Sequence, residues 1–404
     1  MLGTAARTFL SHAPVRRSLR LVLACACLAA CVGGASEGQG AWAAAIDTVN
    51  GVIRVRNPAR PRCVTPGHVE RDLTIGTASG DASYEFAKVW DVAADERGGI
   101  YVADPGRREV LAYDSTGRFR RIIGRSGEGP GEFRAPTGVE WRDGVLAVLD
   151  YVVSRVSFFT ADGVLVRDTT LRGVRYPGSF AWPMSHRLLV QVGPNWMSPP
   201  VPGEYGIGRL LSIGLGTTNA LDTFVVWSDS GASAHFAAPG VSLVAEVPFG
   251  ARAVWAPNHD GGVFFAKGTD YTIRQYGPDG AVRREIQRLH TRISVSARER
   301  DSVQARVASY DRRLAERIRV PPTKAAVRGL QVDDRGRLWV RVSRDREGQD
   351  QQWDVFVADG TYSFTLFLPA GGDVKLIHGS RIYAVATDSL GVAQVDRYRY
   401  SGPC

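Results

Sequence analysis

An internal repeat with a fixed spacing of residues constrains the fold of this chain more than any other feature. Residues 98–117 resemble residues 143–163, and the aspartate at Asp104 recurs 46 residues later at Asp150. The same pattern of apolar and glycine positions returns at residues 261–280, with Lys267 at the position of the aspartate. Similarity at a period of about 45 residues is typical of repeat proteins, in which each unit buries its apolar face against its neighbours.

Each copy has the pattern of four antiparallel strands. Alternating apolar residues form the strands, and turns of the Asp-x-x-Gly kind separate them, as at residues 89–123. Four-stranded units of this length are the blades of β-propellers. Six units begin near residues 86, 136, 179, 251, 326 and 371. We therefore predict an all-β, six-bladed β-propeller over residues 63–404.

Residues 1–30 have the pattern of a signal peptide. A basic segment precedes an apolar run at residues 21–30, which is too short to cross about 30 Å of hydrocarbon. The run ends in Leu-Ala-Ala-Cys31, which resembles a bacterial lipobox. Cys31 is thus the expected lipidation site, and residues 31–62 are expected to be a flexible tether to the membrane. Ordinary signal cleavage after Ala43 or Ala45 is the alternative, and it predicts a soluble periplasmic or secreted protein.

The two ends of the repeat region predict how the ring closes. The last copy has three strands before Cys404, and residues 68–76 align with the fourth strand of the first copy. We expect this N-terminal strand to complete the last blade. Two cysteines in an oxidising compartment favour a disulfide, so a Cys63–Cys404 bridge is predicted in place of the missing hairpin.

The composition indicates a globular protein without a basic patch in its sequence. Apolar residues make up 44% and charged residues 23%, which excludes long disorder and a polytopic membrane protein. The net charge of +9 comes mainly from Arg residues scattered among acids, and loss of residues 1–30 with their four Arg lowers it to +5. A nucleic acid is therefore not an expected partner, because its phosphates require clustered basic residues.

Three segments are longer than the repeat requires, at residues 192–208, 291–325 and 343–352. All three fall on turns or connections that open on one face of a propeller, where long loops usually serve recognition. The longest segment is predicted to contain a helix, with Ser296 and Glu299 as a capping box. A helical lid that serves only the structure is the alternative. Its apolar face repeats at spacings of three and four: Val303, Val307, Tyr310, Leu314 and Ile318.

Basic and aromatic residues are expected around the same mouth, where they would suit an anionic or sugar-like ligand. The alternative is that these Arg residues are solvated turn residues. The predicted ligand-binding residues are Arg107, Arg155, Arg175, Trp196, Tyr205 and Lys267.

Residues 123–150 carry a family resemblance, most specifically the Gly-Pro-Gly-Glu-Phe segment at residues 129–133. They resemble the NHL-type repeat of bacterial six-bladed β-propellers, although Lys267 departs from the repeated aspartate. The resemblance implies relatives that include binding scaffolds, an α-amidating lyase and metal-dependent lactonases.

Enzyme motifs of the G-x-S-x-G, H-E-x-x-H and C-x-x-C kinds do not occur in the sequence. We therefore predict no catalytic residue, no metal site and no cofactor. The expected function is an exported, membrane-tethered binding module that recognises an envelope protein, peptide or glycan at the face with the insertions. The alternative is a lyase or lactone hydrolase that uses Zn or Ca in the central channel.

Overall fold

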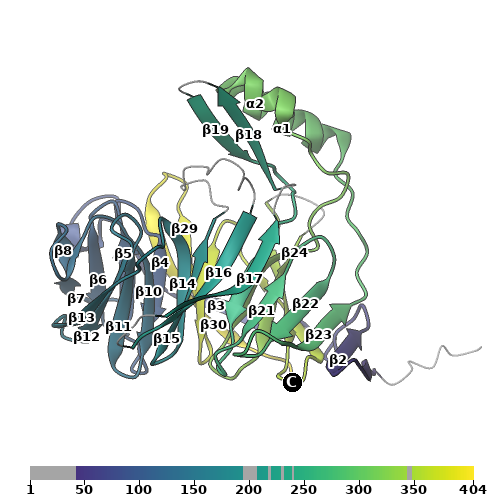
Figure 1. Cartoon of the computed structure of the whole chain (residues 1–404), viewed down its shortest axis with the longest axis horizontal. Coiled ribbons are helices and arrows are strands. Elements are labelled where there is room, and N and C mark those ends of the chain that lie inside the picture. Colours follow the sequence, from purple (N-terminus) through teal and green to yellow (C-terminus); the bar gives the residue numbers. More distant parts are fainter. Residues whose placement is uncertain (1–41, 194–206, 217–219, 229–231, 239–240, 344–347) are drawn as a thin grey trace, which may run out of the picture. The chain divides into compact units, whose positions relative to one another are not determined.

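Six blades of four antiparallel strands each form a β-propeller (Figure 1). Five blades are separate four-stranded sheets, and the fourth blade belongs to a six-stranded sheet. The structure is a computed structural model that describes residues 42–193, 207–216, 220–228, 232–238, 241–343 and 348–404. The first strand of each blade begins within a few residues of the predicted unit boundaries, so the predicted six-bladed fold is confirmed.

The first three blades follow one another directly along the chain. Their strands are β4 (Asp91–Ala94), β5 (Ile100–Asp104), β6 (Glu109–Tyr113) and β7 (Phe119–Ile123); β10 (Pro136–Arg142), β11 (Val145–Asp150), β12 (Arg155–Thr160) and β13 (Leu165–Thr170); and β14 (Pro177–Met184), β15 (Arg187–Val192), β16 (Ile207–Gly214) and β17 (Leu221–Ser228).

Insertions separate the third, fourth and fifth blades, and the sixth takes its last strand from the N-terminal part of the chain. The strands are β20 (Val254–Pro257), β21 (Val263–Ala266), β22 (Thr272–Tyr276) and β23 (Val282–Arg288); β24 (Val327–Val332), β25 (Leu338–Val342), β26 (Gln351–Phe356) and β27 (Tyr362–Leu368); and β28 (Asp373–His378), β29 (Arg381–Thr387), β30 (Ala393–Ser401) and β3 (His68–Ile75).

The ring closes where β3 pairs with β30, from His68 opposite Ser401 to Ile75 opposite Val395. The Cys63–Cys404 disulfide lies just beyond this pair, with 6.4 Å between the two Cα atoms. Both features agree with the predicted closure of the last blade by an N-terminal strand.

The chain before β3 is also ordered against the ring. β1 (Ala45–Val49) and β2 (Val52–Asn57) form a hairpin, and β2 pairs in parallel with the outer strand β23 of the fourth blade. The prediction of a flexible tether over residues 31–62 is therefore corrected for residues 45–57. An exposed outer strand offers unpaired backbone groups, which explains why this segment becomes a strand.

Asn57 then joins the fourth blade to the fifth. Its Nδ2 donates to the carbonyls of Gln287 and Gly360, and its Oδ1 accepts from the Tyr362 amide. The Cys63 amide next donates to the Ser363 carbonyl of the fifth blade. One N-terminal segment thus crosses the outer edges of three blades.

Each interface between neighbouring blades has its own apolar core. Ile123 of the first blade packs with Val148 of the second, and Val395 of the sixth packs with Val92 of the first. Four further clusters fill the other four interfaces. The ring therefore closes through continuous packing as well as through the disulfide.

The repeated aspartates hold the connections between blades. Asp104 accepts hydrogen bonds from the amides of Ala87, Lys88 and Arg107. Asp150 accepts four such bonds from its own turn and from the incoming connection. These contacts give the repeated aspartate a structural role. At Lys267 in the fourth blade, a backbone bond from the Ala326 amide to the Gly268 carbonyl holds the connection instead.

A cap stands at one face of the ring (Figure 1). It consists of the hairpin β18 (Ser233–Ala238) and β19 (Val241–Glu246), which precedes the fourth blade, and of α1 (Ala297–Tyr310) and α2 (Arg312–Arg317), which follow it. The capping box of Ser296 and Glu299 is present. The insertion holds two helices because Asp311 is extended and caps α2, and Tyr310, predicted on the apolar face, is 80% exposed.

Candidate functional site

A separate apolar core holds the cap together. Val303 of α1 and Ile318 after α2 pack against Val247, Phe249 and Val295 from the connecting segments. Helix α2 also contacts both strands of the β18–β19 hairpin. The two insertions are far apart in the sequence, and this core makes one unit of them.

Two paired segments connect the helices to the ring. Ser294 and Thr323 form an antiparallel bridge, and the Lys324 amide donates to the Ile293 carbonyl. The buried Lys324 ammonium forms an ion pair with Glu299 at 2.6 Å. Hydrogen bonds from Lys324 and from the Ser296 amide lower the pKa of Glu299 to about 2. The helical part of the cap is thereby fixed to the segment that leads into the fifth blade.

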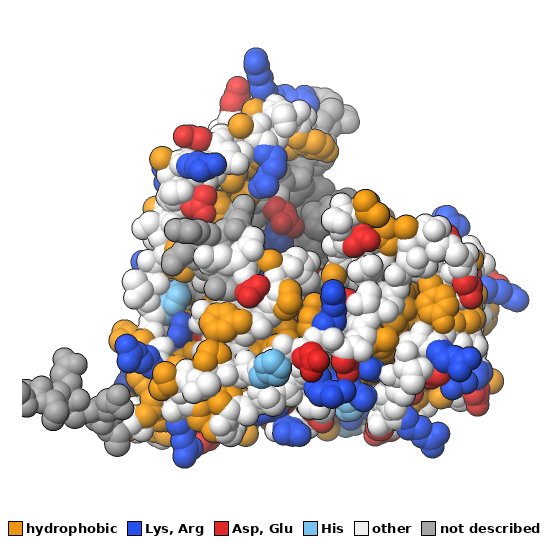
Figure 2. Space-filling view, turned by 180° about the vertical axis from the view of Figure 1, so that it is seen from behind, with side chains coloured by type: hydrophobic (Ala, Val, Ile, Leu, Met, Phe, Trp, Pro, Cys, Tyr) orange, Lys and Arg blue, Asp and Glu red, His pale blue; other side chains and the backbone are white. Residues whose placement is uncertain are grey.

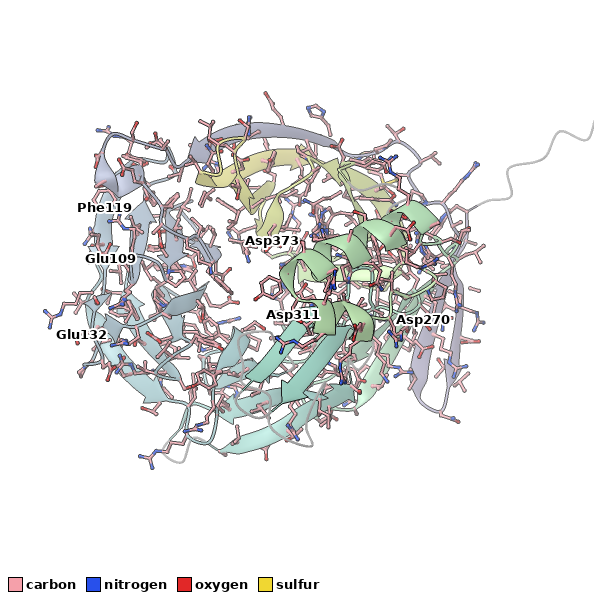
Figure 3. The ribbon with its side chains drawn as sticks, turned by 90° about the horizontal axis from the view of Figure 1, so that it is seen from above. Glu109, Phe119, Glu132, Asp270, Asp311 and Asp373 are labelled. Atoms are coloured by element: carbon pink, nitrogen blue, oxygen red, sulfur yellow. A yellow bond between two sulfur atoms is a disulfide. The ribbon has the colours of Figure 1, made fainter. Side chains whose placement is uncertain are left out.

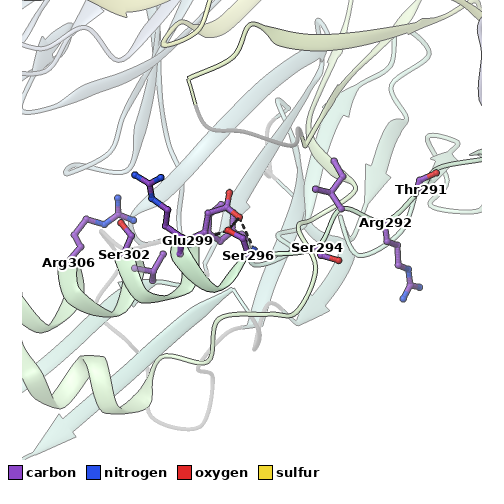
Figure 4. Close-up of a pocket in the computed structure, with 11 residues that line it drawn as sticks. Thr291, Arg292, Ser294, Ser296, Glu299, Ser302 and Arg306 are labelled. Atoms are coloured by element: carbon purple, nitrogen blue, oxygen red, sulfur yellow. Dashed lines mark hydrogen bonds between the residues drawn. The ribbon is translucent and has the colours of Figure 1, made fainter.

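A cavity of about 980 Å³ lies between α1 and the segment that precedes it (Figure 4). Glu299, Ser302 and Arg306 project from one side of α1 and line it, as expected from their helical spacing. Ser294 and Phe249 contribute from the connecting segments. The lining thus combines polar, charged and aromatic groups.

Two further cavities adjoin the first. One, of about 510 Å³, shares Phe249 with it and reaches the fifth blade. The other, of about 360 Å³, shares Thr291 and Ile293 with the first and Val342 with the second. We call these three neighbouring cavities the hollow. It lies between the cap and the fourth and fifth blades.

Cations gather where the hollow meets the fifth blade. Lys324, Arg328 and Arg341 line the cavity of about 510 Å³. Burial, together with the neighbouring Arg328 guanidinium, lowers the pKa of Arg341. Burial is the main cause of this decrease, and the carboxylate of Asp373 partly offsets the repulsion from Arg328.

The central channel is a second candidate site. The inner strands of all six blades line a cavity of about 460 Å³. Seen from above, the blades surround this region, and Asp373 of β28 lies at the inner edge of the ring whereas Glu109, Phe119 and Glu132 lie at its periphery (Figure 3).

Two carboxylates face this channel from neighbouring blades. Burial raises the pKa of Glu140 to about 8, and the nearby charge of Asp91 adds to the increase. Burial raises the pKa of Asp91 to about 6, although the charge of Lys375 opposes it. Perturbed carboxylic acids in a cavity are typical of proton-transfer sites, although structural groups also show such shifts.

The described residues hold no group of three or more His, Cys, Asp and Glu side chains arranged as ligands for a metal ion. The carboxylate pair of the channel therefore does not by itself provide a metal site. Among the same residues, no helix has the length and apolar character needed to span a membrane.

Of the predicted ligand-binding residues, the four that the structure describes line neither the channel nor the hollow. Arg107 forms an ion pair with Glu109, and Arg155 donates to the carbonyls of Glu128, Gly129 and Glu132, which holds that connection in place. Because of these contacts the two side chains are not the solvated turn residues of the alternative, and they are only 22% and 11% exposed. Arg175 and Lys267 are exposed and line neither the channel nor the hollow. Trp196 and Tyr205 lie outside the described residues.

Sequence reasoning missed the residues that line the two cavities. Glu140 stands between Val139 and Trp141 in an inner strand, and Arg341 interrupts the apolar run of β25. A charged residue inside an otherwise apolar strand is a signal that could have identified both. Lys324 follows two prolines in a loop and carries no comparable signal.

Charges on the surface are mixed. On the face shown in Figure 2, Lys and Arg side chains alternate with Asp and Glu, and apolar side chains lie between them. Among the described residues, Arg283 and Asp279 form an exposed ion pair.

The chain matches no protein-family model and no curated protein sequence. It is similar in structure to a Bacteroides fragilis protein described as exported, with 10% identity, a TM-score of 0.46, and coverage of 86% of this chain and 100% of the other. A member of the DUF4221 family from Bacteroides vulgatus has 9% identity and a TM-score of 0.50, with 83% and 99% covered. A gluconolactonase from Xanthomonas campestris has 11% identity and a TM-score of 0.42, with 82% and 99% covered. At these identities the likeness shows the propeller fold alone.

Proposed function

We propose that this chain is an exported binding protein whose ligand, a protein segment, peptide or glycan, enters the hollow under the cap. The cap is the observation that carries this proposal. It has its own core, and the six interfaces between blades have theirs, so closure of the ring does not require it. A rigid scaffold with elaborated connections on one face is a common arrangement for recognition.

A test of this proposal fills the hollow without disturbing the ring. Ser302 lines the cavity of about 980 Å³, so Ser302→Trp should weaken ligand binding about tenfold or more. The control is Ser309→Trp, at an exposed position of α1 that does not line the hollow. Arrays of envelope glycans and peptides, probed with the chain from Cys31 onward, provide the readout. Equal binding by the Ser302→Trp variant and the wild type would contradict the proposal.

Export and lipid attachment at Cys31 belong to the same proposal, as does the NHL-type character of the repeats. The apolar run before Cys31 and its lipobox-like sequence support them. Labelling with an alkyne-tagged fatty acid in a bacterial host should mark the wild type and the Cys27→Ser variant. The Cys31→Ser variant should carry no label and should leave the membrane fraction. Equal labelling of all three proteins would overturn the lipid anchor.

An enzyme acting in the central channel is the second candidate, because Asp91 and Glu140 face the channel with raised pKa values. Such a pair suits general acid and base steps in a lyase or a lactone hydrolase. The residues that the structure describes contain no group arranged as a metal site, so no step is assigned to Zn or Ca. Lactone hydrolysis that is lost in Glu140→Gln and retained in Ser302→Trp would favour this candidate over the binding module.

A further inference from the structure

The N-terminal segment that crosses the outer edges of the blades is basic. Arg residues are scattered over the sequence as a whole, but residues 42–67 hold four of them and a single acidic residue, Asp47. Arg56 is paired with Asp47 at 2.8 Å. Arg60 and Arg62 are exposed, and within the described part of the chain neither guanidinium has an ion-pair partner. The segment thus presents unpaired positive charge to the solvent.

Exposed apolar side chains accompany these two arginines. Val64, two residues after Arg62, is 71% exposed. Leu289 is also 71% exposed, and its amide donates to the Asn57 carbonyl, which places it beside the same segment. Apolar side chains next to unpaired cations are typical of surfaces that adsorb to anionic lipid, because apolar burial and electrostatic attraction then add.

The start of the described chain lies at this surface. Trp42 is the first described residue, and its Nε1 donates to the Arg60 carbonyl at 2.8 Å. Trp42 follows Cys31 by 11 residues, from 42 − 31, and an extended chain of that length spans at most about 40 Å. A lipid on Cys31 would therefore hold Arg60 close to a bilayer.

We propose that the surface made of Arg60, Arg62, Val64 and Leu289, which we call the basic edge, docks on a bilayer that contains anionic phospholipid. The two guanidinium groups bind lipid phosphates, and the two apolar side chains enter the headgroup region. This inference rests on the lipid attachment proposed above and adds the side on which the ring is held. The contact is reversible and sensitive to salt, so it supplements the anchor and does not replace it.

A bilayer fits the basic edge better than a second copy of the chain. Two copies that met through this surface would bring Arg60 and Arg62 of both close together, and like charges at an interface oppose association. An anionic bilayer neutralises the same charges. The proximity of the proposed anchor favours the same partner.

Co-sedimentation with vesicles tests the inference on the chain from Cys31 onward carrying Cys31→Ser, which has no lipid of its own. Vesicles of phosphatidylglycerol and phosphatidylcholine in equal parts should bind it about tenfold more tightly than phosphatidylcholine alone, and salt should weaken the binding. Arg60→Gln combined with Arg62→Gln should weaken binding to the anionic vesicles about tenfold. The control combines Arg172→Gln and Arg175→Gln, which removes the same charge from exposed positions between the second and third blades and should change little.

A second pair of variants tests the apolar part of the basic edge. Leu289→Ser should weaken binding to the anionic vesicles several-fold, and this effect should persist at high salt. Leu390→Ser, at a position that is 81% exposed on the sixth blade, is its control and should bind like the parent. Unchanged thermal unfolding shows that each variant is folded.

Three results would overturn the inference. They are equal binding to the two kinds of vesicle, equal losses in the two double Arg variants, and a dimer in the absence of vesicles that only the Arg60 and Arg62 variant disrupts. If the wild type carries the fatty-acid label but the Cys31→Ser chain binds no vesicles, the inference fails and the lipid anchor stands. If the Cys31→Ser chain binds anionic vesicles and the wild type carries no label, the anchor fails and the basic edge stands.

Discussion

The ring and the cap differ in how they are stabilised. Each blade interface of the ring holds a core of its own, and strands from both ends of the described chain tie the last blade shut. The cap depends on a single small core and on connecting segments such as the pair of Ser294 and Thr323. The ring thus provides rigidity through repetition, and the cap provides a surface that is not repeated. In a propeller, recognition is expected where the repetition ends.

The disulfide gives the largest expected effect on the ring. Cys63→Ser combined with Cys404→Ser removes a covalent closure over a sequence separation of 341 residues. Urea unfolding should show a loss of about 4 kcal/mol in the free energy of unfolding. The cap should keep its hydrogen-exchange protection, because its core contains neither cysteine. A loss below about 1 kcal/mol would mean that β-sheet pairing alone closes the ring.

A matched pair of substitutions tests whether the ring and the cap unfold independently. Leu366 in the ring and Leu314 in the cap are both fully buried. Leu366→Ala should lower the global free energy of unfolding by about 2–5 kcal/mol. Leu314→Ala should release the cap locally and leave the main unfolding transition unchanged. If both variants shift the urea midpoint equally, the cap and the ring are one cooperative unit.

The stabilities of the ring and of the cap should depend on pH in opposite directions. The folded state keeps a proton on Glu140 up to a pKa of about 8, whereas the unfolded chain releases it near 4.5. The free energy of unfolding should therefore fall as the pH rises from about 5 to about 8, on the order of 2–4 kcal/mol. Glu140→Gln should flatten this slope in urea titrations at each pH, and an unchanged slope would contradict the assignment.

Glu299 in the cap should show the reverse behaviour. Its pKa is lowered to about 2, so its contribution to cap stability is present above pH 4.5 and is lost as the pH falls through about 2. Hydrogen exchange of α1 should accordingly become faster in acid. Glu299→Gln should make the exchange of α1 less sensitive to acid.

The smallest effect concerns the start of α1. Ser296 accepts a hydrogen bond from the Glu299 amide at 3.2 Å, and its loss in Ser296→Ala should destabilise the helix by about 1 kcal/mol. Ser309→Ala at the other end of α1 is the control, because the Ser309 hydroxyl donates to the Arg306 carbonyl within the same helix. Faster exchange of α1 amides only in Ser296→Ala is the expected result. Equal exchange rates of the α1 amides in the two variants would show that the capping box does not stabilise the helix.

The ring could be predicted from the sequence because its pattern is local and repeated. Asp104 and Asp150 mark corresponding turns, and the alignment of residues 68–76 with a fourth strand was enough to predict how the last blade closes. The cap could be predicted only in part. Ser296 and Glu299 form a local capping signal, but nothing in the sequence indicates that the β18–β19 hairpin meets α2.

The candidate site could not be predicted either, because it forms where segments distant in the sequence meet. Arg341 and Gln351 belong to regular strands of the fifth blade, and their meeting with Lys324 depends on how the insertion returns to the ring. The predicted Arg107 and Arg155 lie instead in connections that their own side chains hold in place. Arginines near turns can be identified in a sequence, whereas a cavity made by tertiary packing cannot.

Hydrogen exchange of the mature protein with and without the glycan or peptide that it binds most tightly on the arrays tests the central claim most directly. The account predicts that the ligand slows exchange in α1, in the segment around Lys324 and in β24 and β25, and leaves the turns near Arg107, Arg175 and Lys267 unchanged. Protection confined to those turns or to the inner strands around Glu140 would contradict the claim that recognition takes place under the cap.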